Sequence, residues 1–96
     1  MPNIDKDKQR KSQKEHMRRK RRARRILLFF NKSCVRCGFS DGRALEYHHK
    51  NPKEKSFTIG RSLTLPLEKI LKEIEKCELL CANCHTIEHR KNMFDI

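Results

Sequence analysis

The chain has 96 residues, of which 35% are hydrophobic and 38% are charged, and its formal net charge is +12. This length corresponds to one small domain, and the composition excludes a membrane-spanning helix and a large enzyme that encloses its substrate. Small domains with so thin a core usually add disulfides or a bound metal. The N-terminus shows no signal-peptide pattern, so we expect an intracellular, cytoplasmic protein with no membrane partner.

Residues 1–33 are interpreted as a basic N-terminal arm, and residues 34–96 as the domain that follows it. The arm carries 13 Lys and Arg against 3 Asp and Glu, whereas the domain carries 11 against 9. No Gly or Pro interrupts residues 6–30, which predicts a helix, and we expect the residues before about Lys14 to be disordered. The apolar end, Ile26–Phe30, is expected to dock on the domain.

The charge of the arm indicates a polyanion as partner, and a solvated tail is the alternative. A duplex groove lined with phosphates would relieve the repulsion between neighbouring cations and release counterions. We expect DNA, with RNA not excluded. The predicted phosphate contacts are Arg18, Arg19, Lys20, Arg21, Arg22, Arg24 and Arg25.

Two Cys-x-x-Cys pairs, 43 residues apart, frame most of the domain. Four thiolates at this spacing suit tetrahedral zinc, so we predict a structural four-cysteine zinc site. Gly38 supplies a left-handed turn that lets backbone amides point at the sulfurs. Two disulfides are the competing interpretation, but they would leave Cys77 unpaired. We expect Cys77 to be a small buried side chain. The predicted zinc ligands are Cys34, Cys37, Cys81 and Cys84.

Between the pairs, residues 44–49 have the character of a short strand that ends before a turn at Asn51-Pro52. Ser56–Gly60 is expected to be a second strand or an extended loop. Leu65–Glu75 has apolar positions at helical spacing and a proline in its first turn, which predicts an amphipathic helix. We expect its charged face to contact solvent and assign no chemistry to Glu68, Lys69, Lys72, Glu73 and Glu75.

Four histidines indicate a second metal site. His85 and His89 directly follow the second cysteine pair, in a segment, Ala82–Met93, that lacks Gly and Pro. On a helix, residues four apart share one face. His48 and His49 end the predicted strand, where adjacent side chains point to opposite sides. One of them can then face a metal while the other faces a substrate.

The chain from about Cys34 to Arg90 resembles the HNH endonucleases, also called ββα-metal nucleases, and it is closest to the small zinc-knuckle forms common in phage genomes. The matching segments are Cys34–Gly38, Leu45–Pro52 and Leu79–His89. The resemblance implies a small α+β fold with a ββα-metal motif stapled by the four-cysteine zinc knuckle. Most of the family has Asp-His where this chain has His48-His49, a pair similar to that of colicin-type bacterial DNases.

The resemblance also implies a role for each histidine. His49 is similar to the general base that takes a proton from the attacking water. His48 and His85 occupy metal-ligand positions and complete the predicted catalytic set, and His89 lies where His-rich relatives have a further ligand. The catalytic ion is expected to be Mg²⁺, Mn²⁺, Ni²⁺ or Zn²⁺, and nitrogen ligands favour the softer ions over Mg²⁺.

One position departs from the family pattern. The family's Asn, which braces the loop carrying the general base, is expected nine residues before His85, where this chain has Lys76. Either Asn83 or backbone contacts would then brace the loop. We predict an HNH endonuclease that hydrolyses phosphodiester bonds of DNA. The alternatives are a non-catalytic zinc-knuckle nucleic-acid-binding protein, which Lys76 favours, and a structural treble-clef module of a ribonucleoprotein.

Overall fold

The computed structural model describes residues 2–95, with side chains for residues 7–95. Within this range the fold is a small α+β arrangement of three α-helices and one two-stranded antiparallel sheet. Three short 3-10 helices lie in the connecting segments, at Gly42–Ala44, Pro52–Glu54 and Ile59–Arg61. No helix in the described part of the chain is long and apolar enough to cross a membrane.

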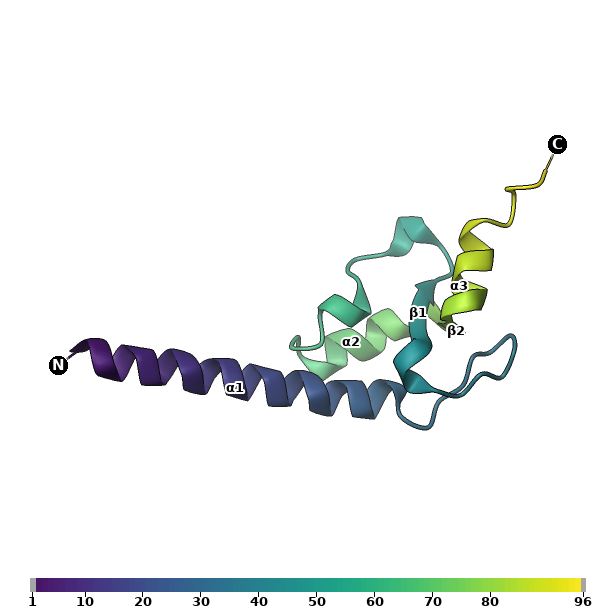
Figure 1. The fold of residues 1–96 in the computed structure, drawn as a ribbon. Coiled ribbons are helices and arrows are strands. Elements are labelled where there is room, and N and C mark those ends of the chain that lie inside the picture. Colours follow the sequence, from purple (N-terminus) through teal and green to yellow (C-terminus); the bar gives the residue numbers. More distant parts are fainter. Residues whose placement is uncertain (1, 96) are drawn as a thin grey trace.

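Helix α1 (Pro2–Phe29) projects away from the rest of the molecule (Figure 1). Because of this projection, the molecule as a whole measures 68 Å along its longest axis. The predicted helix is therefore confirmed, but the expectation of disorder before Lys14 is wrong. No Gly or Pro follows Pro2 in this segment, and proline itself is tolerated in the first turn of a helix. Residues 7–19 are exposed along this helix.

The C-terminal end of α1 is fixed on the domain by packing and by two hydrogen bonds. Within the apolar segment Ile26–Phe30, Leu28 is buried, whereas three of its neighbours remain more than half exposed. The hydroxyl of Tyr47 donates to the carbonyl oxygen of Leu28 at 2.7 Å. The guanidinium of Arg24 donates to the carbonyl oxygen of Leu65 at 3.4 Å. The expected docking is thus made mainly through Leu28.

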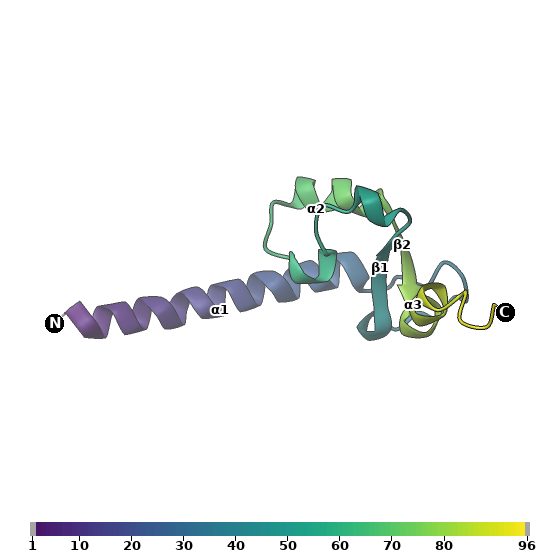
Figure 2. The same ribbon diagram turned by 90° about the horizontal axis from the view of Figure 1, so that it is seen from above.

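The sheet pairs β1 (Leu45–His49) with β2 (Cys77–Cys81), so that Leu45 lies opposite Cys81 and His49 opposite Cys77. Helix α2 (Leu67–Ile74) lies on one side of the strands and α3 (Ala82–His89) on the other (Figures 1 and 2). The second edge of β1 is unpaired within the described residues. Because side chains alternate along a strand, β1 presents different residues to α2 and to α3.

Two predicted helices differ from the structure in extent, and the structure decides the alternative left open for a third segment. The helix expected over Leu65–Glu75 is α2, which begins two residues later, after Pro66. The helix expected after the second cysteine pair ends at His89. Of the two alternatives for Ser56–Gly60 the structure has the loop, and its last two residues begin the 3-10 helix Ile59–Arg61. Ile59 is 1% exposed, so its packing in the core replaces strand pairing in this segment.

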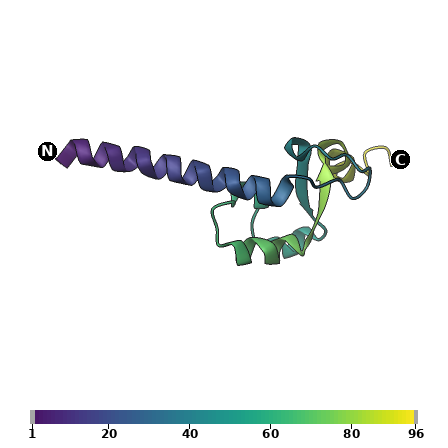
Figure 3. The ribbon, with the colours of Figure 1, turned by 90° about the horizontal axis from the view of Figure 1, so that it is seen from below.

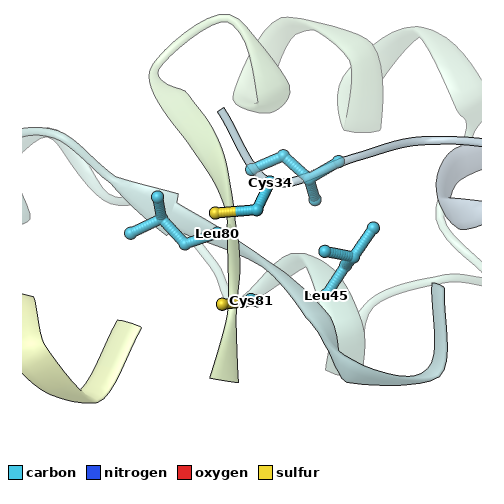
Figure 4. Packing of buried hydrophobic residues seen from close by; sticks show 5 residues of the cluster. Cys34, Leu45, Leu80 and Cys81 are labelled. Atoms are coloured by element: carbon cyan, nitrogen blue, oxygen red, sulfur yellow. The ribbon is translucent and has the colours of Figure 1, made fainter. Parts of the chain in front are cut away.

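The buried side chains form two clusters, one around the cysteines and one between α1 and α2. The first includes Cys34, Leu45, Leu80 and Cys81 (Figure 4). In the second, Leu28 of α1 packs with residues of α2 and of the connecting segment, and Figure 3 shows both on the same side of α1. The cysteine cluster is therefore part of the core that holds β1 and β2 together.

Candidate metal centres and pocket

The cysteines of the two Cys-x-x-Cys pairs lie together where the loop after α1 meets the junction of β2 and α3. Their Sγ atoms all lie within 4.8 Å of one another, and those of Cys37 and Cys81 are 3.5 Å apart. Tetrahedral zinc, with bonds of about 2.3 Å, holds its sulfur ligands about 3.8 Å apart, so the four thiols fit this ion. All five cysteines are free, which favours the predicted metal site over two disulfides. The candidate ligands are Cys34, Cys37, Cys81 and Cys84.

The backbone around these sulfurs favours thiolates. Gly38 has a φ of 80°, as predicted for the turn after the first pair. The N–H of Cys84 donates to Sγ of Cys81 at 3.4 Å and lowers the pKa of that thiol. Burial opposes ionisation of Cys34, but backbone N–H groups outweigh it and lower its pKa to about 6. Contact with the Cys81 sulfur raises the pKa of Cys84 to about 12, because adjacent thiolates repel each other until a cation joins them.

Cys77 lies outside this cluster. Its Sγ donates to the carbonyl oxygen of Glu73 at 3.4 Å. Burial, and then the nearby Glu73 carboxylate, raise the pKa of the Cys77 thiol to about 11. A protonated, half-buried thiol is a packing residue, as the sequence predicts, and a poor metal ligand.

Three histidines form a second cluster on the α3 side of the sheet. His48 projects from β1 toward His85 and His89, and ligand nitrogens of the three rings lie within 4.8 Å of one another. The Nε2 atoms of His85 and His89 are 2.8 Å apart, as their spacing on one helix face predicts. Burial, and then the two neighbouring imidazoles, lower the pKa of His48. The neutral ring is the form that binds metals, so the three nitrogens suit a divalent ion.

Glu46 joins the histidine cluster, although the sequence pattern did not single it out. Its Oε2 lies 3.1 Å from Nδ1 of His85, a buried atom that makes no well-aligned hydrogen bond. A carboxylate at the far nitrogen of a metal-binding histidine orients the ring. One signal could have found Glu46: it lies two residues before His48, so both side chains belong to the same face of the strand.

His49 faces the opposite side of β1 and is buried against α2. It is 7% exposed, and its Nε2 lies 2.7 Å from Oε2 of Glu73. The expectation that Glu73 belongs to a solvent-facing surface is wrong, because this residue is 2% exposed while Leu71 remains 47% exposed. Helix α2 packs through Ile70 and its last turn, which turns Glu73 toward the end of β1. The structure therefore separates His49 from the three-histidine cluster by the thickness of the strand.

Three polar groups surround the buried carboxylate of Glu73. Its Oε2 accepts from the backbone N–H of Ser56 at 2.9 Å and lies 2.7 Å from Nε2 of His49, and its Oε1 accepts from Nζ of Lys76 at 3.0 Å. Burial alone would raise the pKa of this carboxyl, but hydrogen bonds from Ser56, Lys76 and His49 outweigh it and lower the pKa to about 2. Glu73 is consequently ionised at neutral pH.

Lys76 braces the loop that follows β1. It occupies the position at which the resemblance predicts Asn. Its ammonium donates to the carbonyl oxygen of Glu54 at 3.1 Å and to Oγ of Ser56 at 3.4 Å. Its own carbonyl oxygen accepts from the N–H of Lys50 at 3.0 Å. Asn83 is exposed and makes no side-chain hydrogen bond among the described residues. The bracing therefore comes from Lys76 itself, through both its side chain and its backbone.

A pocket of about 600 Å³ brings the two faces of β1 together. All five residues of β1 line it, as does α3 through His85 and His89, and we place it along the unpaired edge of the strand. The connecting segment contributes Lys55 and Arg61, two cations that form no ion pair among residues 7–95. The pocket thus combines the three-histidine cluster, His49 and two available positive charges.

The predicted phosphate-contacting residues of the arm differ in their surroundings. Lys20 and Arg24 are half-buried on the side of α1 that faces the domain. Arg19 is exposed and lies 3.8 Å from Glu15. The remaining four are exposed and have no ion pair in the described part of the chain: Arg18, Arg21, Arg22 and Arg25. The arm therefore keeps a solvent-facing positive surface.

Comparisons with protein-family models, with curated proteins and with solved structures found no match. The features of this chain that bear on its function are the two clusters of candidate ligands, the pocket beside β1 and the basic helix.

Proposed function

We propose that this protein is a metal-dependent endonuclease of the HNH type that hydrolyses phosphodiester bonds of DNA. The observation that carries the proposal is the pocket lined by both His49 and the three histidines that can hold a divalent ion. Strand β1 supplies His48 and His49, and helix α3, which follows β2, supplies His85 and His89; this order of two strands and a helix is compatible with a ββα-metal motif. A structural zinc at the four cysteines would tie the loop after α1 to β2 and α3 and keep the small scaffold rigid.

The pocket offers the groups that hydrolysis of a phosphodiester needs. A divalent ion held by His48, His85 and His89 would supply charge stabilisation for the phosphoryl oxygens and for the leaving 3′ oxygen. Nitrogen ligands favour Zn²⁺, Ni²⁺, Co²⁺ or Mn²⁺ over Mg²⁺. His49 takes the proton from the attacking water. Lys55 and Arg61 bind phosphate oxygens of the substrate from the opposite wall.

DNA as the substrate is supported by the arm. Helix α1 has 28 residues, which corresponds to about 42 Å at a rise of about 1.5 Å per residue. This length exceeds the roughly 34–36 Å of one turn of duplex. Cations along such a helix contact phosphates and give affinity without reading the sequence. RNA is the second substrate to be tested in the same assay.

A second candidate function is favoured by one observation. His49 is 7% exposed and its Nε2 is held by Glu73, as expected of a histidine whose role is structural. In that case the protein is a non-catalytic zinc-knuckle protein that binds nucleic acid. Both candidates use the arm and the cysteine cluster, and they differ only in whether the pocket performs chemistry.

Incubation with supercoiled plasmid, or with a structured RNA, separates the two candidates. The full chain is tested with Mg²⁺, Mn²⁺, Co²⁺, Ni²⁺, Zn²⁺ and a chelator, and we expect metal-dependent nicking. His49→Ala should lower the cleavage rate by at least ~10²-fold with unchanged DNA affinity. His16→Ala, which alters an exposed histidine of the arm, is the matched control and should cut normally. Plasmid binding without cleavage under every ion would establish the second candidate instead.

A further inference from the structure

We infer that Glu73, held in place by Lys76, is a positioning residue that fixes His49 in the tautomer with its proton on Nε2 and its free electron pair on Nδ1. The inference rests on the proposed function, in which His49 accepts a proton from water, and it names the accepting atom as Nδ1. Neither Glu73 nor Lys76 lines the pocket. Their effect on the reaction therefore passes entirely through His49.

The first step concerns which nitrogen of His49 carries the proton. An ionised carboxylate has only acceptors to offer. The Nε2 atom of His49 lies 2.7 Å from Oε2 of Glu73, a hydrogen-bond distance typical of a charge-assisted pair. If Nε2 carried no proton, its free electron pair would face an electron pair of Oε2, and the two atoms would repel each other. The Nε2 atom therefore donates, and the neutral imidazole keeps its free electron pair on Nδ1.

The second step concerns what Nδ1 can reach. This atom has no hydrogen-bond partner among the described residues. Among these residues, the buried side-chain nitrogen without a partner is Nδ1 of His85, so Nδ1 of His49 is accessible to solvent. His49 is one of the residues that line the pocket beside β1. A water molecule in the pocket can therefore approach Nδ1, while the buried side of the ring is occupied by Glu73.

The third step concerns why the carboxylate keeps its place. Its donors come from three separate parts of the chain: the end of β1, the loop at Ser56 and the residue before β2, Lys76. Lys76 also supplies the positive charge that a buried carboxylate requires. Because Lys76 donates to the same loop at Glu54, the loop, the carboxylate and the ring of His49 are held as one unit.

A spectroscopic measurement tests the tautomer independently of activity. The full chain is labelled with ¹⁵N, loaded with Zn²⁺ and examined by long-range ¹H–¹⁵N correlation of its imidazoles. The signals of His49 are identified by their loss in His49→Ala. We expect a protonated Nε2 and an unprotonated Nδ1. A protonated Nδ1, or a mixture of the two tautomers, would overturn the inference.

Two double variants with identical net charge test whether the positioning matters for cleavage. Glu73→Gln with Lys76→Met removes both buried charges but keeps an oxygen that accepts from His49. Glu73→Leu with Lys76→Met removes the acceptor as well and leaves a side chain of similar volume. We expect the first variant to cut plasmid more slowly than the parent, because the ammonium of Lys76 no longer holds the side chain at position 73, but clearly faster than the second variant. The second should lose about 10–100-fold in kcat with an unchanged KM for DNA, and its His49 should populate both tautomers.

The outcomes separate this inference from the proposed function. Zinc content and the amide spectrum first establish that both double variants are folded. Equal cleavage by the two variants would show that Glu73 only stabilises the fold, and would overturn the inference while leaving the nuclease proposal intact. A parent chain that cuts nothing would remove the nuclease proposal, and the imidazole spectrum would still decide the tautomer.

Discussion

Four exposed cations of the arm lie along one face of α1. If all four are neutralised together, the affinity for DNA should depend less steeply on salt concentration. The residues follow each other at intervals of four, four and three, which keeps them on one side of a helix. None of them has an ion pair among residues 7–95. The variant replaces each of them with glutamine: Lys14, Arg18, Arg22 and Arg25.

The size of the effect follows from counterion release. Each phosphate contact on duplex DNA contributes about 0.9 to the slope of log K against log salt, so four contacts contribute about 3.6. Between about 50 and 200 mM salt, a fourfold change, this slope corresponds to a loss of about 150-fold in affinity. Over this range of salt, the affinity of the parent for DNA should therefore fall by a factor about 150 times larger than the factor for the variant. Two unrelated duplexes should give the same difference, because phosphate contacts carry no sequence information.

Titration by fluorescence anisotropy at several salt concentrations measures both slopes. The matched control replaces four cations on the other faces of α1 with glutamine and removes the same charge: Lys8, Arg19, Lys20 and Arg24. We expect the control to keep most of the slope of the parent. Equal slopes for the two variants would refute a single phosphate-binding face, and an unchanged slope in both would show that the arm does not grip DNA.

Three further predictions concern the metal sites and the anchoring of the arm. Cys84→Ser should release zinc and unfold the domain, whereas Cys77→Ser should retain zinc in native mass spectrometry; equal zinc in both would contradict the four-cysteine site. His89→Ala should keep the zinc bound by the cysteines and weaken Ni²⁺ binding in calorimetry, with His16→Ala as the unaffected control. Tyr47→Phe should lower the free energy of unfolding by about 1 kcal/mol in a denaturant titration, because it removes the hydrogen bond to Leu28; an unchanged midpoint would show that this bond does not stabilise the anchored arm.

Local rules predicted much of the candidate site. The cysteine spacing, the turn at Gly38 and the shared helix face of His85 and His89 depend on residues close together in the sequence, and the structure has all three. The alternation of a strand correctly separated His48 from His49.

The remaining contacts depend on how distant elements pack. Periodicity placed Glu73 on the charged face of α2, but the rotation of this helix against the sheet decides which of its residues are buried. Lys76 contacts a loop about 20 residues away in sequence, with Ser56 and Glu54 as its partners. No local pattern reveals such a pairing. The expectation of disorder before Lys14 rests on the general mobility of chain termini, whereas the absence of helix-breaking residues after Pro2 lets α1 extend to the start of the described chain.

The hydrogen bond from Tyr47 to Leu28 has a mechanical consequence. Tyr47 is the residue before His48, so the strand that carries the first candidate metal ligand also carries the attachment point of α1. Gly42 adds a second attachment, since a Cβ at this position would lie 2.7 Å from the carbonyl oxygen of Phe29. Both contacts join the C-terminal end of α1 to the strand that lines the pocket or to the 3-10 helix directly before it, so the direction of the arm relative to the pocket is set at this joint. In the proposed nuclease, the offset in base pairs between the stretch that is gripped and the bond that is cut is set by this joint.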